Sequence, residues 1–225
     1  EAAQILNLRT LFREGRYDEA IAVLEGLHAA GSEALARETN PYRPTALASR
    51  GMISAVDEGV EVRRAQGVEA VLESEALDVL RRGRSVYDPM FGGGPQHRVL
   101  LDIFPTAQRF IQASGLPPEA VRKTGVVALS KWSRLLISSP RALSRGYGWK
   151  DTVAHEYIHL VISVQSEDRA PVWLQEGLAK LLETRWRSPE NSSLTVHQRS
   201  LLARAIKSGE FVPFEKFKLS MAYLD

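Results

Sequence analysis

The chain has 225 residues, 44% of them hydrophobic, which is enough to bury one core of good size and to carry a small appended element. Its 29 basic and 27 acidic residues give a formal net charge of +2, so neither nucleic acid nor an anionic membrane is indicated as a partner. No apolar run approaches the roughly 18 to 20 residues of a membrane-spanning helix. Cysteine is absent, so any metal site must use His and carboxylate ligands.

Residues 5–30 predict two short helices. Apolar residues recur at helical spacing on each side of Gly15-Arg16, and Gly31 is placed to end the second helix. The stretch GRYDEAI, from Gly15 to Ile21, resembles the start of the second helix in a tetratricopeptide repeat. One such unit is visible, whereas about three are needed to bury a continuous core. An ordinary helical hairpin is therefore the alternative interpretation.

A turn-rich break, Asn40-Pro41-Tyr42-Arg43-Pro44, follows the hairpin. Residues that precede proline avoid the helical conformation, so no helix is expected to continue through this segment. We therefore predict a helical, tetratricopeptide-like appendage over residues 1–44 and a main domain over residues 45–225.

In the main domain, the sequence patterns predict mostly strands first and helices afterwards, which indicates an α+β fold. Strands are expected around residues 60–62, 99–104, 126–129 and 135–138. Helices are expected over residues 70–82, after Thr106, over 152–164 and over 172–186. Lys131-Trp132-Ser133 is a candidate for a tight connection between two strands, and Thr106 and Asp151 are candidates for N-caps. Pro171 stands near the start of the last helix.

One further stretch of the sequence could be taken for a phosphate-binding loop. Gly92-Gly93-Gly94-Pro95 is rich in glycine, but no Gly-Lys-Ser/Thr follows it and no clear strand precedes it, as a phosphate-binding loop would require. We predict a flexible loop there.

His155-Glu156-Tyr157-Ile158-His159 forms an HExxH motif inside one of the predicted helices. Imidazoles four residues apart project from one helix face, about 5 to 6 Å apart at Cβ, so both can bind one ion. Glu156 is rotated by about 100° around the helix, where it can take a proton from water that the metal activates. The motif predicts His155 and His159 as metal ligands and Glu156 as the general base.

Catalytic zinc takes three protein ligands and leaves one position open. Glu176, in the segment PVWLQEGLA, is the candidate for the third ligand, and Gly177 beside it is expected to let the two helices approach closely. The alternative is that the histidines lie on a helix surface and bind nothing. Their strongly apolar surroundings argue against it, because an unpaired buried His or Glu is unfavourable.

HEYIH followed by PVWLQEGLA is similar to the gluzincin peptidases of the peptidase MA-like superfamily, and looks closest to bacterial domains that occur with tetratricopeptide repeats. The resemblance covers residues 55–187. It implies a zincin-like α+β domain, with a small mixed sheet, an HExxH helix and a third-ligand helix, here preceded by a helical hairpin. It also implies Zn²⁺ held by His155, His159 and Glu176, Glu156 as base, and an edge strand at 135–138 that pairs with the substrate backbone.

The resemblance leaves the oxyanion-stabilising residue open. Gluzincins place a Tyr or His beyond the third ligand, and such a donor is worth roughly 100- to 1,000-fold in rate. Tyr223 and His197 lie downstream, but the sequence positions neither, and the domain is a candidate for C-terminal truncation or weak activity. Glu183, two turns after Glu176, is a candidate to orient a ligand histidine, with a surface ion pair as the alternative.

These patterns predict a zinc-dependent metallopeptidase that cleaves a peptide or protein substrate. An endopeptidase is favoured, because no Gly-x-Met-x-Asn-like segment marks an aminopeptidase. The alternatives are a weak or inactive zincin-fold adaptor that binds a protein partner through its N-terminal helices, and a latent enzyme covered by residues 1–50. The first residue is Glu1, which suggests a removed leader or upstream segment and favours the bacterial cell envelope or secretion over the cytoplasm.

Overall fold

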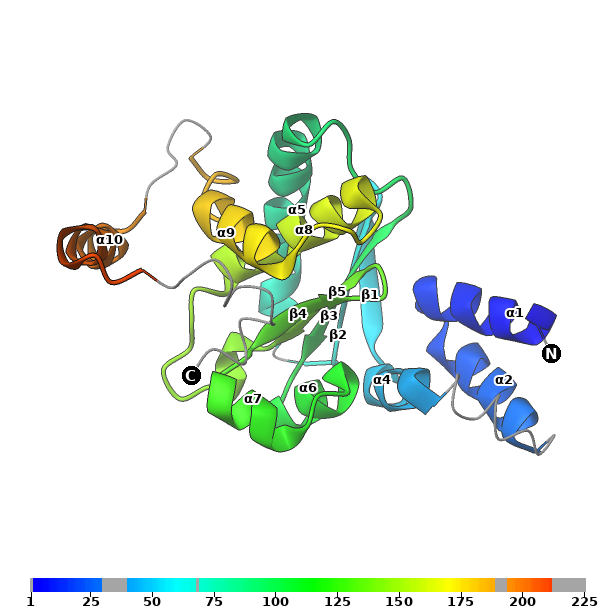
Figure 1. Ribbon diagram of the computed structural model, residues 1–225. Coiled ribbons are helices and arrows are strands. Elements are labelled where there is room, and N and C mark those ends of the chain that lie inside the picture. The colour runs from blue at the N-terminus through cyan, green and yellow to red at the C-terminus, as the bar shows by residue number, and fades with distance from the viewer. Residues whose placement is uncertain (1, 30–39, 68, 189–193, 212–225) are drawn as a thin grey trace. The chain divides into compact units, whose positions relative to one another are not determined.

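The computed structural model describes residues 2–29, 40–67, 69–188 and 194–211 (Figure 1). Helices and one five-stranded mixed sheet make up this part of the chain, which confirms the predicted α+β class. The chain divides into two compact units. Residues 1–78 and 96–149 form the sheet unit, and residues 79–95 and 150–225 form the helical unit. None of the described helices has the length and apolar character needed to cross a membrane.

The sheet has the strand order β1-β2-β3-β5-β4. Its strands are β1 (Ile53–Asp57), β2 (Val60–Arg64), β3 (Val99–Phe104), β4 (Ala128–Lys131) and β5 (Arg134–Ser138). β2, β3 and β5 run parallel, while β1 and β4 pair antiparallel at the two edges. The register sets Leu101 of β3 opposite Val62 and Leu135, all three buried. Trp132 and Ser133 have φ values of 54° and 62°, so the predicted tight connection between β4 and β5 is confirmed.

The prediction that residues 135–138 form an edge strand is wrong. β5 pairs with β3 on one side and with β4 on the other, so both of its edges are used. All five residues of β5 are buried, whereas three of the four residues in β4 are only partly buried. A continuous apolar run is typical of a strand covered on both faces, and it favours the interior of a sheet.

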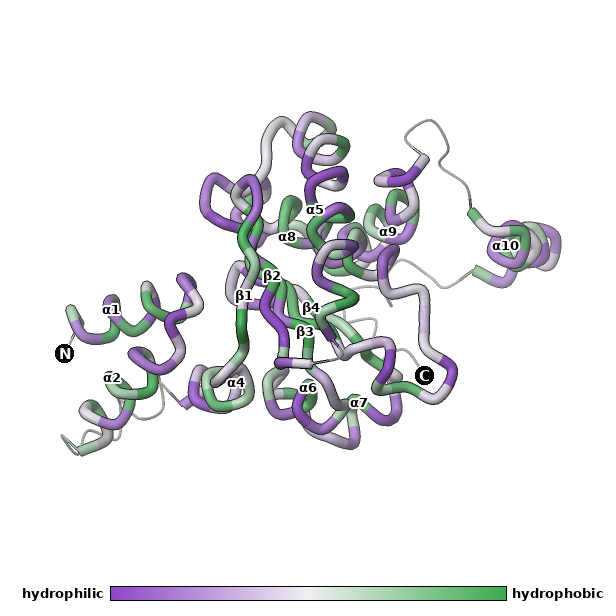
Figure 2. The backbone as a smooth tube through the Cα atoms, turned by 180° about the vertical axis from the view of Figure 1, so that it is seen from behind, coloured by the Kyte–Doolittle hydropathy of each residue, from purple (hydrophilic) through white to green (hydrophobic). Residues whose placement is uncertain are grey.

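The N-terminal hairpin consists of α1 (Ala2–Arg13) and α2 (Tyr17–Ala29). Leu8, Leu11, Leu24 and Leu27 pack together between the two helices. Figure 2 shows hydrophilic and hydrophobic stretches alternating along both helices, as expected of amphipathic helices. The predicted end of the second helix at Gly31 lies outside the described residues. Both helices belong to the same compact unit as the sheet, and a domain boundary at residue 44 stays a prediction.

A helix begins inside the segment that the sequence predicted as a break. The short helix η1 (Asn40–Tyr42) leads directly into α4 (Arg43–Ser49), and a proline occupies the first turn of α4. Proline is accepted there because the first helical N–H groups have no partner within the helix. α4 contacts α2 and α6 (Ala107–Ser114), and α6 contacts β3 and β5. The prolines therefore mark the start of a new helix within the segment that the sequence predicted as a break.

The sheet unit also contains two short helices, α7 (Pro118–Thr124) and η2 (Pro140–Ala142). The N-terminal part of the longer helix α5 (Ala70–Met90) belongs to this unit as well. Thr106 caps α6 as predicted, because its hydroxyl accepts a hydrogen bond from the backbone N–H of Arg109 at 3.2 Å.

A buried polar cluster joins the hairpin to the sheet. Tyr17 of α2 donates a hydrogen bond of 2.6 Å to Oδ2 of Asp102 in β3. The Arg134 guanidinium of β5 lies 3.8 Å from the same oxygen and 4.2 Å from the centre of the Phe12 ring. Asp102 and Arg134 are both fully buried, and burial raises the pKa of Asp102 and lowers that of Arg134. The N-terminal hairpin is thus attached to the sheet by buried contacts of Tyr17 and Phe12 with Asp102 and Arg134.

The helical unit contains the C-terminal part of α5, with α8 (Trp149–Ser166), α9 (Val172–Leu182) and α10 (Val196–Ser208). α5 ends at Met90, well beyond the predicted end at residue 82, because Tyr87 continues its buried face. The Tyr87 hydroxyl donates a hydrogen bond to the carbonyl oxygen of Leu182 at 2.9 Å and accepts one from the backbone N–H of Trp186 at 3.1 Å. α9 ends at Leu182, so the prediction of a helix up to residue 186 was too long.

Candidate metal centre

The HExxH motif lies in the middle of α8, as predicted. The helix begins at Trp149, so Asp151 falls in its first turn and is not the N-cap. Instead, Asp151 accepts hydrogen bonds from Trp186 Nε1 at 2.9 Å and from the Arg187 guanidinium at 2.9 and 3.0 Å. This pairing ties the start of α8 to the segment that follows α9, and so helps to fix the two helices on which the candidate ligands lie.

The structure brings His155, His159 and Glu176 together. The Nε2 atoms of the two imidazoles are 3.1 Å apart. The Glu176 carboxylate presents one oxygen to each ring, Oε2 at 3.5 Å from His155 Nε2 and Oε1 at 3.5 Å from His159 Nε2. In the part of the chain that the structure describes, this is the group of His and carboxylate side chains that converges well enough to hold a metal ion.

These separations suit a small ion with tetrahedral coordination. Zinc binds imidazole nitrogen at about 2.0 to 2.1 Å and carboxylate oxygen at about 2.0 to 2.2 Å, which sets neighbouring tetrahedral ligand atoms about 3.3 Å apart. The measured separations of 3.1 to 3.5 Å bracket that value. The donor set of two imidazoles and one carboxylate therefore fits Zn²⁺.

One side of the ligand group is open to solvent. The side chains of His155 and His159 are 17% and 13% exposed, whereas that of Glu176 is 40% exposed. A catalytic metal needs a coordination position that substrate or water can reach, while a structural metal has all its positions closed by protein. The partial exposure of the group favours the catalytic type.

Glu183 contacts the first candidate ligand. Its Oε2 lies 3.1 Å from Nδ1 of His155, and its Oε1 accepts a hydrogen bond of 2.7 Å from Lys180. A carboxylate at Nδ1 fixes the proton on that nitrogen, which leaves the lone pair of Nε2 directed at the ligand group. Glu183 forms the ion pair with Lys180 and also contacts His155, and its role in orienting a ligand stays a prediction.

The electrostatics of the group favour a positive charge at its centre. Burial lowers the pKa of His155, but hydrogen bonds with Glu176 and Glu183 outweigh burial and raise it to about 9. Hydrogen bonds from His155 and His159 hold the pKa of Glu176 well below its usual range. Both shifts mean that the neighbouring carboxylates stabilise positive charge on the imidazole, and a metal ion would have to displace the proton of His155.

Glu156 lies next to His155 on α8 and is buried, with 7% of its surface exposed. Its negative charge contributes to the raised pKa of His155, so the carboxylate is close to the ligand group. It is not one of the three converging ligands. A buried carboxylate near a metal position, and not bound to it, is suited to accepting a proton.

The glycine-rich loop after α5 is held in place, although the sequence predicted a flexible loop. Gln165 of α8 donates a hydrogen bond of 3.0 Å to the carbonyl oxygen of Gly93, and Gly93 N–H donates to Asp88 O at 2.8 Å. A Cβ atom on Gly94 would lie 2.2 Å from the Asp88 carboxylate. Tyr157, inside the HExxH motif, donates a hydrogen bond of 2.6 Å to the same carboxylate. The loop and α5 therefore help to position α8, which carries the candidate ligands His155 and His159.

Gly177 does not have the role that the sequence suggested. Apart from its chain neighbours and the backbone of its own helix, no atom would lie within 4 Å of a Cβ atom at this position. The residue is also exposed. The prediction of a close helix approach at Gly177 is therefore wrong. The helical unit is held instead by larger residues such as Tyr157 and Leu182, which are buried.

The oxyanion-stabilising residue stays open. His197 lies exposed on α10 and makes no hydrogen bond or ion pair within the described ranges. Tyr223 lies outside the described residues. The sequence named both candidates from their order in the chain alone, and order does not place a side chain beside a metal.

Comparisons with protein-family models, with curated proteins and with solved structures gave no match to this chain.

Proposed function

We propose that the chain is a zinc-dependent metallopeptidase in which His155, His159 and Glu176 hold the ion and Glu156 is the general base. The convergence of two imidazoles and a carboxylate at 3.1 to 3.5 Å, one residue away from a buried glutamate, supports the proposal most directly. The gluzincin-like pattern HEYIH with PVWLQEGLA supports it independently.

Each residue has a distinct task in the proposed reaction. Bound zinc supplies a Lewis acid that polarises a carbonyl group and makes water more acidic. Glu156 accepts the proton of the attacking water and then delivers it to the leaving amine. Glu183 holds the His155 ring in the orientation that ligation needs. The proposed substrate is a peptide or protein, cleaved internally.

The decisive experiment compares Glu156→Gln with the wild type in zinc content and in cleavage of a fluorogenic peptide library. Glutamine cannot accept a proton from water, so cleavage should fall by at least about a hundredfold. Zinc content should stay near one ion per chain, because Glu156 is not among the converging ligands. Glu167→Gln is the matched control, since Glu167 is an exposed residue of the same unit with a side chain 77% accessible.

The competing function is an adaptor with a weak or inactive zincin fold. It predicts that zinc binds and that no peptide is cleaved by the wild type, or that Glu156→Gln changes nothing. Either result would reject the peptidase proposal. Absence of zinc after reconstitution would reject the metal centre itself.

A further inference from the structure

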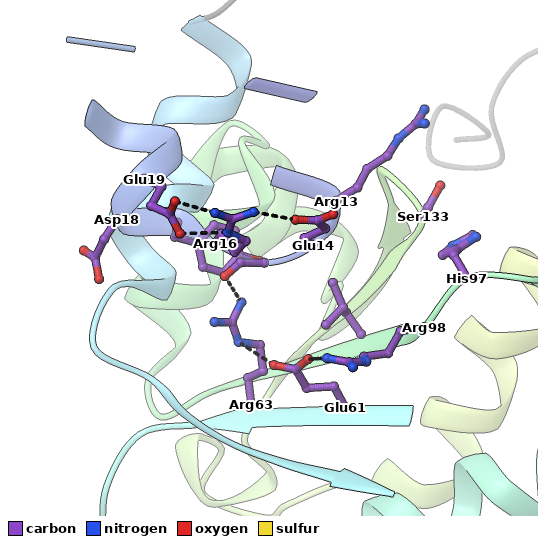
Figure 3. A pocket seen from close by; sticks show the side chains of 13 residues that line it. Arg13, Glu14, Arg16, Asp18, Glu19, Glu61, Arg63, His97, Arg98 and Ser133 are labelled. Carbon is purple, nitrogen blue, oxygen red and sulfur yellow. Dashed lines mark hydrogen bonds and ion pairs between the residues drawn. The ribbon is translucent and has the colours of Figure 1, made fainter. Parts of the chain in front are cut away.

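The sheet unit contains a cleft that the proposed reaction does not use. Its volume is about 810 Å³, within the range of about 300 to 1,000 Å³ that is typical of ligand sites. Four segments form its walls: the α1–α2 junction, β2, the chain leading into β3, and the β4–β5 turn (Figure 3). Four arginines line it and no lysine does.

The floor of the cleft is built from charged side chains of two strands. Glu61 of β2 is more than nine-tenths buried and pairs with Arg98 at 2.9 Å and with Arg63 at 3.5 Å. Arg63 donates a hydrogen bond to the carbonyl oxygen of Gly15 and lies 4.7 Å from the centre of the Tyr17 ring. Gly15 has a φ of +70° and its Cβ would collide with Arg63, so the loop requires glycine there. This arrangement fixes the floor.

All four carboxylates of the lining are already in ion pairs. Glu14 and Glu19 both pair with Arg16, at 3.0 and 2.5 Å, and Figure 3 shows this triad on one wall. Asp18 pairs with Arg50 at 2.8 Å, and Glu61 pairs as described above. The cleft therefore presents no unpaired carboxylate from the described residues.

Hydrogen-bond donors remain unused on the other side of the cleft. Arg13, His97 and Ser133 line it and make no hydrogen bond or ion pair to any described residue. Arg98 uses one nitrogen for Glu61, and its side chain is 55% exposed. In the view of Figure 3, Ser133, His97 and Arg98 lie to the right of the Arg16 triad, and the Arg13 side chain starts beside Glu14 and extends away from the triad. A guanidinium presents several planar donors that match a carboxylate.

We propose that this cleft binds an acidic peptide segment, with Arg13 and Arg98 receiving its carboxylates and Ser133 and His97 completing the contact. A free carboxylate is small compared with a cleft of about 810 Å³, so the anionic group is expected on a larger body. A stretch of peptide carries side-chain carboxylates and also backbone groups that the polar walls can hydrogen-bond. This inference is independent of the metal centre, which lies in the other compact unit.

The test measures binding of a fluorescent peptide with adjacent glutamates to the full chain, by anisotropy, with a chelator present so that no metal-dependent cleavage consumes the probe. The same peptide with glutamines is the matched ligand. The glutamate peptide should bind at least about tenfold more tightly, and added salt should weaken it. Arg13→Gln should weaken binding about tenfold, because one charge-assisted contact is lost.

Arg9→Gln is the control variant, because Arg9 is exposed on the same helix and does not line the cleft. Arg13 is itself exposed and unpaired among the described residues, so its replacement should leave the fold intact. Equal binding of the two peptides would overturn the proposal, as would Arg13→Gln and Arg98→Gln variants that bind like the wild type. Competition by inorganic phosphate without any preference for glutamate would indicate a small-anion site, and would also overturn it.

Discussion

Two clusters of ionisable side chains, one in each compact unit, differ in composition, burial and arrangement. Asp102 and Arg134 are fully buried, next to the aromatic rings of Phe12 and Tyr17. The side chains of the His155, His159 and Glu176 group are 13% to 40% exposed, and their ligand atoms all lie within 4.8 Å of one another. The first cluster contains a cation that already fills its centre, whereas the second surrounds a position with donor atoms.

The comparison shows that burial of charge does not by itself mark a functional site. The Arg134 guanidinium lies 3.8 Å from Oδ2 of Asp102 and 4.2 Å from the centre of the Phe12 ring, so the charge of Asp102 is matched within the cluster, although no nitrogen of this guanidinium forms a hydrogen bond to a described residue. In the second cluster, two imidazole nitrogens and a carboxylate converge at separations of 3.1 to 3.5 Å. Convergence of electron-pair donors is therefore the better indication of a metal site.

The largest expected effect comes from removing a ligand. His159→Ala should lower zinc affinity by about a thousandfold, or about 4 kcal/mol, because one of three protein ligands is lost. Elemental analysis after dialysis should then find almost no zinc. His197→Ala is the control, since this histidine is exposed on α10 and should leave zinc content unchanged. If His159→Ala retained zinc, the group of His155, His159 and Glu176 would not be the zinc site, and the contrast with the Asp102–Arg134 cluster would fail.

Arg134→Met should lower the free energy of unfolding by about 3 kcal/mol, because a buried carboxylate loses its cation. This value is at the low end of the loss of about 3 to 5 kcal/mol that is usual when a buried ion pair is broken. A small loss is expected because Tyr17 still donates to Asp102 and burial already raises the pKa of that carboxyl group. Urea denaturation measures the change, and zinc content should stay the same. A variant with Asp102→Leu added should regain most of the stability, and a failure to regain it would contradict a purely structural pair.

Glu183→Gln should weaken zinc binding by about 10- to 100-fold, which is typical when a carboxylate that orients a metal-binding histidine is removed. Competition with a chromophoric chelator gives the affinity. Lys180→Gln separates the two contacts of Glu183, because it removes only the ion pair of 2.7 Å and leaves the contact with His155. Equal losses in both variants would mean that Glu183 acts through the surface pair.

Tyr17→Phe should have the smallest effect, a loss of about 1 to 2 kcal/mol in unfolding free energy. It removes the hydrogen bond of 2.6 Å to Asp102 and keeps the ring beside Arg134. Thermal or urea denaturation measures the loss. A loss as large as that of Arg134→Met would show that Asp102 depends on the hydroxyl more than on the guanidinium.

The sequence predicted well wherever the relevant spacing is local. The apolar periodicity placed β3 and β5 close to their observed bounds, and the N-cap side chain of Thr106 marked the start of α6. The position of β5 within the sheet was predicted wrongly, because a strand's neighbours depend on how distant segments pair. The start of α8 was also missed, because Asp151 has the side chain of an N-cap but is used by Trp186 and Arg187.

The sequence by itself determined the relation between His155, Glu156 and His159, since the geometry of a helix fixes the faces of residues one and four apart. The sequence named Glu176 and Glu183 as candidates, but only the tertiary structure shows that they reach these histidines from α9 and its C-cap, and that Arg134 and Asp102 meet beneath the hairpin. Local geometry follows from backbone hydrogen bonds within one segment. Contacts between segments far apart in the chain depend on how the whole core packs, and no short stretch of sequence contains that information.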